Sequence, residues 1–580
     1  MNDLQFAVGR LRASVGGIIQ SLALSLLALS VLMARPAWAG SGAWTPTATQ
    51  AMPLKNIGLL EPIDPAAPLH LAVGLALRNK AQLDTFVQAA GNPGSVLFGS
   101  KLTPAQILAA YAPTTEQAQA VLDYLSEAGF TRLELSDNRL VISAYGPASA
   151  AETAFNTQLV QFQLAGRSVF ANRTAVQVPA ALQGTVAAVA GLQNIASSQS
   201  TLALDFASMP QGLGLNTFQI GTAFDAALFQ GSYDAGDTPT AANTTIGILA
   251  EGDLTQVVKD LRQYEQENDL PQVPVNIVQT GPASTDTSGV GEFDLDSQVS
   301  TGMAGNVREL VLYDAASLND ADLIPAYQRV VADDSVQAVN VSFGACETLE
   351  YLSGAMLLAD IAYETGVAEG ITFFAAAGDA GASCAYLVNL GLPDTGIIGG
   401  VDYPASSPYV VAVGGTTLLI NFSDQYIREL SWDAGGGGIS LWENPPAWQV
   451  GVVPLAGNTE LALTRGIPDV AMDADNNISP ALVVINGANA GEGGTSLSTP
   501  LALGAWARIE TAHDNCYGFA APVLYSLISG LLTAPKGFHD ITLGTNGLYV
   551  ATKGWDYTTG IGSFDIAEVN AALPAVSCKP

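Results

Sequence analysis

Short apolar runs, rich in β-branched residues and separated by helical patterns, fill the part of the chain that follows residue 205. The runs cover residues 246–250, 275–279, 309–313, 339–343, 371–376 and 409–413. Apolar residues at helical spacing lie between several of them, as in 325–332 and 351–366. Buried strands that alternate with helices indicate βαβ units and a parallel sheet. We expect an α/β fold, doubly wound around that sheet, with binding sites beyond the carboxyl ends of the strands.

The preceding segment, residues 69–192, has the pattern of a smaller α+β domain. Thr103 and Pro104 have the properties of a helix N-cap and of a first helical residue. The expected strands cover 69–77, 133–135 and 140–144, and the expected helices cover 79–90, 104 onwards, 114–129 and 179–189. Gly184 lowers the helix propensity of the last of these segments.

A linker is predicted between the two domains. Residues 193–215 contain a run of Ser and Gln, then Pro210, Gly212 and Gly214, which is a composition typical of linkers. We divide the chain into an N-terminal signal (1–39), a first domain (40–192), a linker (193–210) and a second domain (211–580).

The N-terminus has the three parts of an export signal. Arg10 and Arg12 precede an apolar stretch, residues 18–33, and a small-x-small site follows at Ala37-Trp38-Ala39. A membrane anchor is the alternative, but the stretch is short for a span and contains Gln20 and several Ser. We expect cleavage after Ala39 and a secreted or periplasmic protein with no membrane association after signal removal.

Acidic residues are concentrated in the second domain. Of the 580 residues, positions 1–204 contain 11 Lys/Arg and 10 Asp/Glu, whereas positions 205–580 contain 10 Lys/Arg and 43 Asp/Glu. The overall charge of -32 repels phosphate backbones and anionic lipids, which excludes nucleic acids as partners. We interpret the surplus as a surface adapted to low pH. We also expect acid to weaken docking of the first domain, by protonating interface carboxylates that pair with its Lys and Arg.

The chain has four cysteines, namely Cys346, Cys384, Cys516 and Cys578. They allow three disulfide pairings. We favour Cys346–Cys384 and Cys516–Cys578, since the second pair would hold the C-terminal tail. No CxxC spacing supports zinc, and the three histidines, His70, His513 and His539, are scattered.

A candidate nucleophile lies in the segment Gly493–Pro500. Small residues lead into Ser496 and a helical run follows over 500–509, so the hydroxyl can be exposed at a helix start. A simple Ser/Thr helix cap is the alternative interpretation. No histidine has the small-residue neighbourhood of a catalytic loop, so a base for Ser496 would be a carboxylate.

Two further segments offer carboxylates. Glu292 and Asp296 are four residues apart and share one face of a predicted helix, where they would repel unless they share a proton. Asp379 follows the apolar run 371–376, at the carboxyl end of an expected strand. The alternatives are a solvated acidic helix face for the pair and an Asx turn for Asp379.

Together these motifs resemble the sedolisin family of serine-carboxyl peptidases. The resemblance rests on the Ser496 segment and on Tyr403-Pro404-Ala405-Ser406-Ser407-Pro408, Gly414-Gly415-Thr416-Thr417 and Pro468-Asp469-Val470, with Leu77-Arg78-Asn79, Leu102-Thr103-Pro104, Tyr111-Ala112-Pro113 and Val178-Pro179-Ala180 in the first domain. It implies a subtilisin-like catalytic domain after a ferredoxin-like activation propeptide. It also implies Ser496 as nucleophile, Glu292 as its base, Asp296 as the acid behind Glu292, and Asp379 as a protonated oxyanion-hole acid.

The family also implies one structural Ca²⁺ near the C-terminus. The matching ligands are the side chains of Asp540 and Asp556 and the carbonyls of Ile541, Thr552 and Gly554. Thr552 replaces a usual Gly, and two surface turns are the alternative. At the positions of an outer Glu and Trp found in some members, this chain has Ala250 and Phe343.

The resemblance implies an acid-active endopeptidase, made as a zymogen that cleaves its own linker and is inhibited by its own propeptide until then. Proteins or peptides are the expected substrates and a monomer is the expected state. Three alternatives remain: a His-dependent subtilisin-like peptidase, a non-catalytic secreted binding protein, and a glycosidase that uses Glu292 and Asp379.

Overall fold

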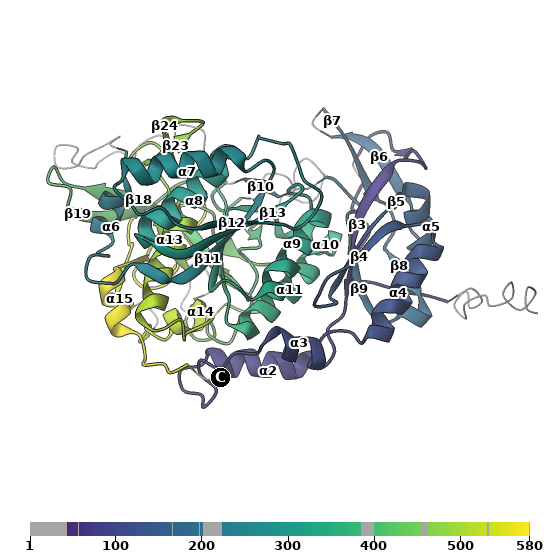
Figure 1. Cartoon of the computed structure of the whole chain (residues 1–580), viewed down its shortest axis with the longest axis horizontal. Helices are drawn as coiled ribbons and strands as arrows, with labels where there is room; N and C mark the ends of the chain where they lie inside the picture. The colour runs from purple at the N-terminus through teal and green to yellow at the C-terminus, as the bar shows by residue number, and fades with distance from the viewer. Residues whose placement is uncertain are drawn as a thin grey trace, which may run out of the picture.

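A computed structural model of the chain describes residues 43–578, except 56, 165, 196–197, 201–222, 384–399, 455–461 and 531–532. The predicted signal, most of the linker and Cys384 therefore lie outside the described residues. A small domain at the N-terminal side packs against a larger α/β domain, and helices α2 (Lys80–Gly91) and α3 (Pro104–Ala110) run beneath the larger domain (Figure 1). No helix of the described part is long and apolar enough to cross a membrane.

The large domain contains the expected parallel sheet. The strands lie in the order β12 (Val275–Gln279), β13 (Val307–Ala315), β11 (Ala241–Glu251), β14 (Ala338–Val341), β16 (Thr372–Ala376), β18 (Val411–Ile420) and β19 (Tyr426–Ser431), and β22 (Val470–Asp473) also pairs with β18. All these pairs are parallel except β18 with β19. The α/β prediction is confirmed.

Helices cover both faces of this sheet. On one face lie α7 (Thr255–Glu267), α8 (Val290–Ala304) and α13 (Thr495–Ala512), and on the other lie α9 (Asp320–Asp333) and α11 (Ala355–Glu369). Strand β11 shows why both faces need a cover. Its residues Ile246 and Ile248 pack on the side of α7, α8 and α13, whereas Leu249 packs on the side of α9 and α11. Side chains that alternate between two apolar layers require buried strands, as the continuous apolar runs predicted.

The small domain is a four-stranded antiparallel sheet with helices. The order is β4 (Thr131–Leu135), β5 (Val141–Pro147), β3 (Pro68–Leu75) and β9 (Val186–Ala190), with α4 (Thr115–Glu127) and α5 (Ala148–Ala154) as its connecting helices. This is the ferredoxin-like topology. Thr103 accepts a hydrogen bond from the backbone N–H of Gln106, so the predicted helix start is confirmed.

One predicted element of the small domain is wrong. Instead of a helix over 179–189, the chain has a single 3-10 turn, Ala180–Leu182, followed by strand β9. Val189 and Ala190 pair with β3, and Val189 joins the core of the domain. Sheet pairing therefore determines the structure here, and it overrides the helical preference of alanine.

The small domain docks on helices α9 and α11 of the large domain. Ala72, Ala188 and Ala190 of its sheet pack against Ile324 and Leu358. Lys80 reaches across and its Nζ lies 2.9 Å from Glu364 Oε2. Burial raises the pKa of Glu364 to about 8. Across the domain boundary, Asp84 raises this pKa further, whereas Lys80 lowers it. The expected weakening of docking by acid stays a prediction.

A short part of the linker is described. Gln199 and Ser200 form β10, which pairs antiparallel with β15 (Phe343–Cys346). Of the two favoured disulfides, Cys516–Cys578 is present and ties the C-terminal tail to the end of α13.

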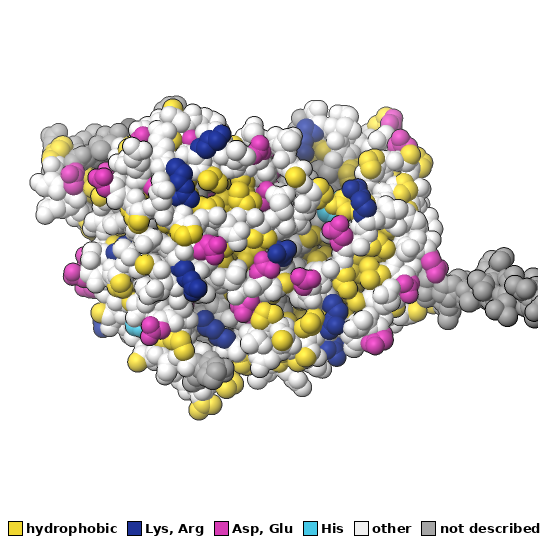
Figure 2. Space-filling view, viewed as in Figure 1, with side chains coloured by type: hydrophobic (Ala, Val, Ile, Leu, Met, Phe, Trp, Pro, Cys, Tyr) yellow, Lys and Arg dark blue, Asp and Glu magenta, His cyan; other side chains and the backbone are white. Residues whose placement is uncertain are grey.

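Many of the acidic residues are inside the large domain. Eighteen carboxyl side chains in the described part of that domain are buried: Glu251, Asp260, Glu265, Glu292, Asp294, Asp296, Asp314, Asp320, Glu347, Glu350, Glu364, Glu369, Glu429, Asp469, Asp473, Asp475, Glu510 and Asp556. On the face seen in Figure 2, acidic and basic side chains are scattered and form no single acidic patch. The composition had suggested that the surplus of acidic residues lies on the surface. Part of it lies instead in the interior of the large domain.

Candidate active site

Helix α8 carries the predicted carboxyl pair. Glu292 is in its first turn and Asp296 lies one turn later, and their side chains are 3% and 0% exposed. The acidic pair is therefore buried, which excludes a solvated helix face. Two buried carboxyls four residues apart are stable together only if at least one holds a proton.

Ser496 is the second residue of helix α13. The helix begins after Gly494, whose φ of 96° belongs to the region that favours glycine. Ser496 is fully buried, and its Oγ lies 3.3 Å from the backbone oxygen of Ser342. Its hydroxyl is also close enough to Glu292 for hydrogen bonding to influence the pKa of that carboxyl. The Gly-rich turn thus places a hydroxyl beside the first carboxyl of α8.

Asp379 follows the end of β16, as expected. Its Oδ1 accepts hydrogen bonds from the backbone N–H and the hydroxyl of Thr495, at 2.8 and 2.7 Å. The other oxygen, Oδ2, accepts no hydrogen bond. Because Thr495 precedes Ser496, this contact holds the carboxyl of Asp379 next to the serine, with one oxygen able to carry a proton and donate it.

All three carboxyls have raised pKa values. Burial raises the pKa of Glu292 to about 7, and hydrogen bonds from Ser200 and Ser496 partly oppose that rise. Burial and the charge of Glu292 raise the pKa of Asp296 well above its usual value. Loss of water raises the pKa of Asp379 to about 8, with Glu292 adding to the effect. The site therefore retains protons well into the neutral range.

Two further residues of the site were not predicted. The Ser342 hydroxyl donates to Asp296 Oδ1 at 2.6 Å, and Asn340 Nδ2 donates to the Ser342 hydroxyl at 2.8 Å. Asn340 lies in the second half of β14 and Ser342 directly follows that strand, and this position at the carboxyl end of a strand was the only signal available in the sequence. They fix the Asp296 carboxyl from the sheet side.

The linker enters this site. The Ser200 hydroxyl donates a hydrogen bond to Glu292 Oε2, and Ser200 pairs with Phe343, the residue after Ser342. Two residues earlier, the backbone N–H of Ser198 donates to the Leu318 oxygen at 3.2 Å. The chain that joins the two domains therefore lies as an added strand along the cleft, in contact with the carboxyl of α8.

The comparisons with known proteins agree with this geometry. A family model of the pro-kumamolisin activation domain matches residues 55–195, and a subtilase family model matches residues 285–529. Sedolisin of Pseudomonas sp. (strain 101) is 37% identical over 583 residues, which cover 96% of this chain and 96% of that protein. The chain belongs to the sedolisin family of serine-carboxyl peptidases.

Two further similarities agree with membership of the sedolisin family. Xanthomonalisin of Xanthomonas sp. (strain T-22) is 37% identical over 562 residues, 88% of this chain and 66% of that protein. A solved structure of Pseudomonas sedolisin, a serine-carboxyl proteinase complexed with two molecules of pseudo-iodotyrostatin, aligns with a TM-score of 0.55 and 37% identity, over 60% of this chain and 98% of that chain. The protein is thus a serine endopeptidase with an activation domain, and neither a non-catalytic binding protein nor a glycosidase.

The three histidines of this sedolisin-family chain have partners elsewhere. His70 Nδ1 lies 2.9 Å from Asp322, and His513 Nε2 lies 2.9 Å from Asn570. His539 stacks on Tyr426. A His-dependent mechanism finds no support in these positions.

The predicted calcium ligands lie around one loop. Asp556 Oδ2 accepts a hydrogen bond from the Thr552 N–H at 2.8 Å, and Asp540 Oδ1 accepts one from the Gly554 N–H at 3.0 Å. Burial raises the pKa of Asp540, with the Gly554 N–H and the charge of Lys553 opposing the rise, and burial raises the pKa of Asp556 to about 6. The set of hard oxygens fits Ca²⁺. Within the described residues, no group of three or more His, Cys, Asp or Glu is arranged to hold a metal ion.

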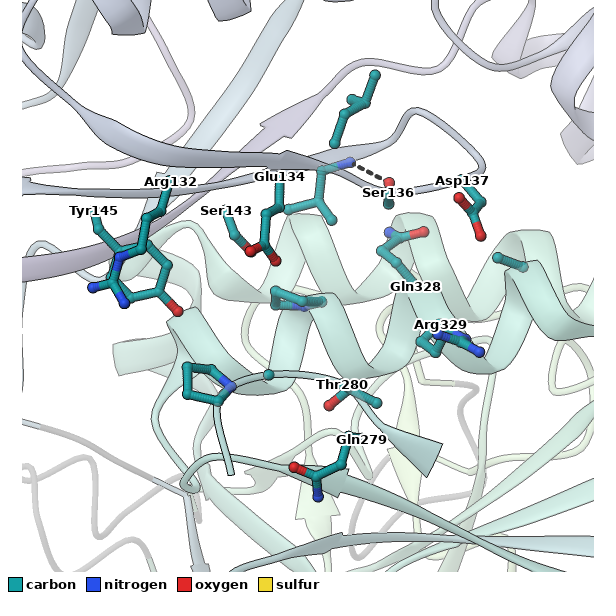
Figure 3. A pocket seen from close by; sticks show the side chains of 16 residues that line it. Arg132, Glu134, Ser136, Asp137, Ser143, Tyr145, Gln279, Thr280, Gln328 and Arg329 are labelled. Carbon is teal, nitrogen blue, oxygen red and sulfur yellow. Dashed lines mark hydrogen bonds between the residues drawn. The ribbon is translucent and has the colours of Figure 1, made fainter. Parts of the chain in front are cut away.

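Two cavities remain between the docked domains. The one in Figure 3 has a volume of about 420 Å³ and lies between the β4–β5 edge of the small domain and α9 of the large one. Its charged side chains are balanced, with Arg132 and Arg329 against Glu134 and Asp137. The second, of about 830 Å³, lies under α2.

Proposed function

We propose that the protein is a secreted, acid-active serine-carboxyl endopeptidase, made as a zymogen that cleaves its own linker. The observation that carries this proposal is the position of Glu292, whose carboxyl is shared by the hydroxyl of Ser496 and that of Ser200 in the linker. A base is thereby next to both a hydroxyl nucleophile and a bound strand of peptide.

In the proposed reaction, Ser496 attacks a peptide carbonyl while Glu292 takes its hydroxyl proton. The Asp379 O–H donates a hydrogen bond to the oxyanion that develops on the carbonyl. Glu292 then returns the proton to the leaving amine, and water repeats the cycle to release the acyl group from Ser496. Asp296, held by Ser342, shares a proton with Glu292 and so adjusts its basicity.

The linker is the first substrate in this proposal. The pairing of Ser200 with Phe343 runs towards Ser342, whose backbone oxygen contacts Ser496 Oγ. We therefore expect cleavage shortly after Ser200, within the 193–210 segment. Until then residues 40–192 act as a propeptide that blocks the cleft, and the catalytic domain begins within the linker, close to position 211.

Acid activity follows from the need for a protonated Asp379. Its pKa is raised, so it can donate a hydrogen bond throughout the acid range. Departure of the linker would hydrate Glu292 and return its pKa towards the ordinary value of about 4.3, which restores a charged base in acid. As pH rises through the pKa of Asp379, the donor is lost and activity falls.

A calcium ion is proposed at the C-terminal loop, held by Asp540, Asp556 and the carbonyls of Ile541, Thr552 and Gly554. When bound, Ca²⁺ supplies positive charge to the half-buried Asp540 and the buried Asp556, and links two segments of the loop. We expect a chelator to lower the thermal midpoint of the protein, and Asp556→Asn to remove that effect. An equal chelator effect in Asp556→Asn would contradict the assignment.

The activity is tested with Ser496→Ala and Glu292→Gln. Both should lose at least about 10³-fold of peptide hydrolysis at pH 4, because nucleophile and base act as a unit. N-terminal sequencing after acid incubation should find no cleavage of the linker in either variant. Ser498→Ala is the matched control, since Ser498 is buried in the same helix and bonds only to the Thr495 oxygen. Full processing by Ser496→Ala would refute the proposal.

Asp379→Asn tests the oxyanion role. An amide donates a hydrogen bond at every pH, so the variant should keep reduced activity while its alkaline limb moves to higher pH. An unchanged alkaline limb would assign that limb to another group.

A further inference from the structure

The larger cavity between the domains has an unbalanced charge. It lies between α2 of the small domain and the catalytic domain, and its volume is about 830 Å³. Four carboxyls line it, Asp84, Asp360, Glu364 and Glu443, against the single ammonium of Lys80. The balanced cavity in Figure 3 offers a direct contrast.

Lys80 neutralises only one end of this cavity. Its Nζ lies 2.6 Å from Asp84 Oδ1 and 2.9 Å from Glu364 Oε2. The Glu364 side chain is 1% exposed, and its second oxygen, Oε1, is buried without a hydrogen bond. An ammonium group seated on two carboxyls thus already shows which chemistry this surface binds. Asp84 and Glu364 also interact with each other, which adds to the rise in the pKa of Glu364.

The other carboxyl pair has no cation in contact among the described residues. Asp360 accepts hydrogen bonds from Ser407 and Tyr403, at 2.6 and 3.0 Å, and none from a charged donor. Glu443 interacts with Asp360 and feels the positive charge of Arg465 only as a minor influence, with Glu347 opposing it. Burial and Asp360 raise the pKa of Glu443 to about 10, because two like charges would otherwise be adjacent.

The remaining wall is apolar and aromatic. Trp448, Phe519 and Tyr525 form a connected group, with ring centroids of Trp448 and Tyr525 4.6 Å apart and of Trp448 and Phe519 6.3 Å apart. Tyr409 lines the cavity beside Lys80. Aromatic faces next to carboxylates attract organic cations by cation–π contact and by burial of their apolar body.

We propose that this cavity binds a small organic ammonium ion with an apolar body, such as an arylalkylamine, with its ammonium on Asp360 and Glu443. Such a ligand touches α2 and the catalytic domain at once, so it stabilises the docked zymogen. The proposal does not depend on which residue attacks the peptide bond.

The test uses the full-length Ser496→Ala chain, which keeps the propeptide attached, and phenethylammonium as the probe in titration calorimetry at pH 7. We expect saturable binding at one site and a higher thermal midpoint. The apparent binding enthalpy should change with the ionisation enthalpy of the buffer, because the amine displaces a proton. Glu443→Gln should weaken binding roughly tenfold, the loss of one charge-assisted hydrogen bond. Affinity should rise from pH 6 to pH 8.

Three controls decide the outcome. Phenethyl alcohol, the neutral isostere, should not bind. Glu134→Gln, in the balanced cavity, should bind the amine like the parent chain. Asp360→Asn provides a second acidic variant if Glu443→Gln unfolds at lower temperature than the parent. Equal binding of the alcohol, unchanged affinity in both acidic variants, or no binding at millimolar amine would overturn the proposal.

Discussion

The two domains differ in where their acidic side chains lie. In the described part of the propeptide domain, no Asp or Glu side chain is buried. The described part of the catalytic domain buries eighteen, and the buried basic side chains there are two arginines, Arg465 and Arg508. Burial of a carboxyl favours its protonated form, so these eighteen groups cannot all be charged. The acidity of this chain is therefore partly a property of its interior.

This difference predicts different responses of the two domains to pH. Burial raises the pKa of Asp294 and Glu369 to about 9 and that of Asp379 to about 8. A carboxyl with a raised folded-state pKa stabilises the fold fully only below its unfolded pKa near 4, and the stability is lost as pH rises towards the folded value. Acid thus favours the catalytic domain, whereas the propeptide domain should be nearly indifferent.

The largest expected effect is on the whole catalytic domain. Raising the pH from 5 to 8 should lower the free energy of unfolding of the Ser496→Ala chain by more than about 5 kcal/mol, since each such group contributes up to about 1.4 kcal/mol per pH unit. Urea unfolding followed by tryptophan fluorescence measures this. A flat profile would mean that the buried carboxyls are solvated or paired in solution.

A second expected effect concerns a buried acid with a buried cation beside it. Arg465 and Asp469 are 0% and 1% exposed, and their Nη2 and Oδ2 atoms lie 2.7 Å apart. Arg465→Met should destabilise the domain by about 3–5 kcal/mol, because it leaves a buried carboxylate without its counter-charge. The double variant with Asp469→Asn should recover part of this loss. If Arg465→Met lowered the free energy of unfolding by no more than an ordinary surface substitution does, the Arg465–Asp469 pair would not contribute to stability.

Asp294 tests the opposite case, an acid without a cation. Asp294 lies on α8 with its side chain fully buried, and neither of its oxygens accepts a hydrogen bond. Burial, with the nearby Asp260, raises its pKa to about 9. Asp294→Asn should flatten the pH dependence of stability by about 1.4 kcal/mol per pH unit between pH 5 and pH 8. Urea titrations at four pH values are sufficient, and Asp123→Asn on the exposed face of α4 is the matched control. An unchanged slope would remove Asp294 from the set of protonated groups.

The smallest effect is expected in the propeptide domain. Glu134 is exposed on β4, so Glu134→Gln should change the unfolding free energy by less than about 0.5 kcal/mol at any pH. A pH-dependent change above that value would show that the propeptide domain also depends on its carboxyls.

The sequence predicted the elements whose signals are local. The cap at Thr103 and the continuous apolar strands need only nearby residues, and both are confirmed. Strand β9 was missed because Val186–Ala190 contains residues that suit a helix equally well, and only pairing with β3 makes it a strand. The single helix predicted over 351–366 is two, α10 (Glu347–Ser353) and α11, separated at Gly354 with a φ of 81°.

The site shows the same division. Glu292 and Asp296 could be placed on one helix face by spacing, and Asp379 could be placed at a strand end by topology. Helix α8, which carries Glu292 and Asp296, is buried on all sides, so the hydrophobic periodicity of its sequence did not indicate its orientation. Ser342 and Ser200 reach the site through backbone pairing with segments far away in sequence, and no local pattern marks such serines. The burial of eighteen acids was also inaccessible, because composition counts charges without locating them.

Strand β10 has a consequence for how this enzyme can evolve. In the proposed reaction, the linker fits the same cleft that later binds foreign peptides, because Ser200 lies against Glu292 and pairs with β15. A mutation that narrows or widens the cleft therefore affects binding of the protein's own linker before it affects binding of any external substrate. Changes in preference are restricted to those that the linker can match, so residues around Gln199 and Ser200 should vary together with the cleft among descendants of this protein.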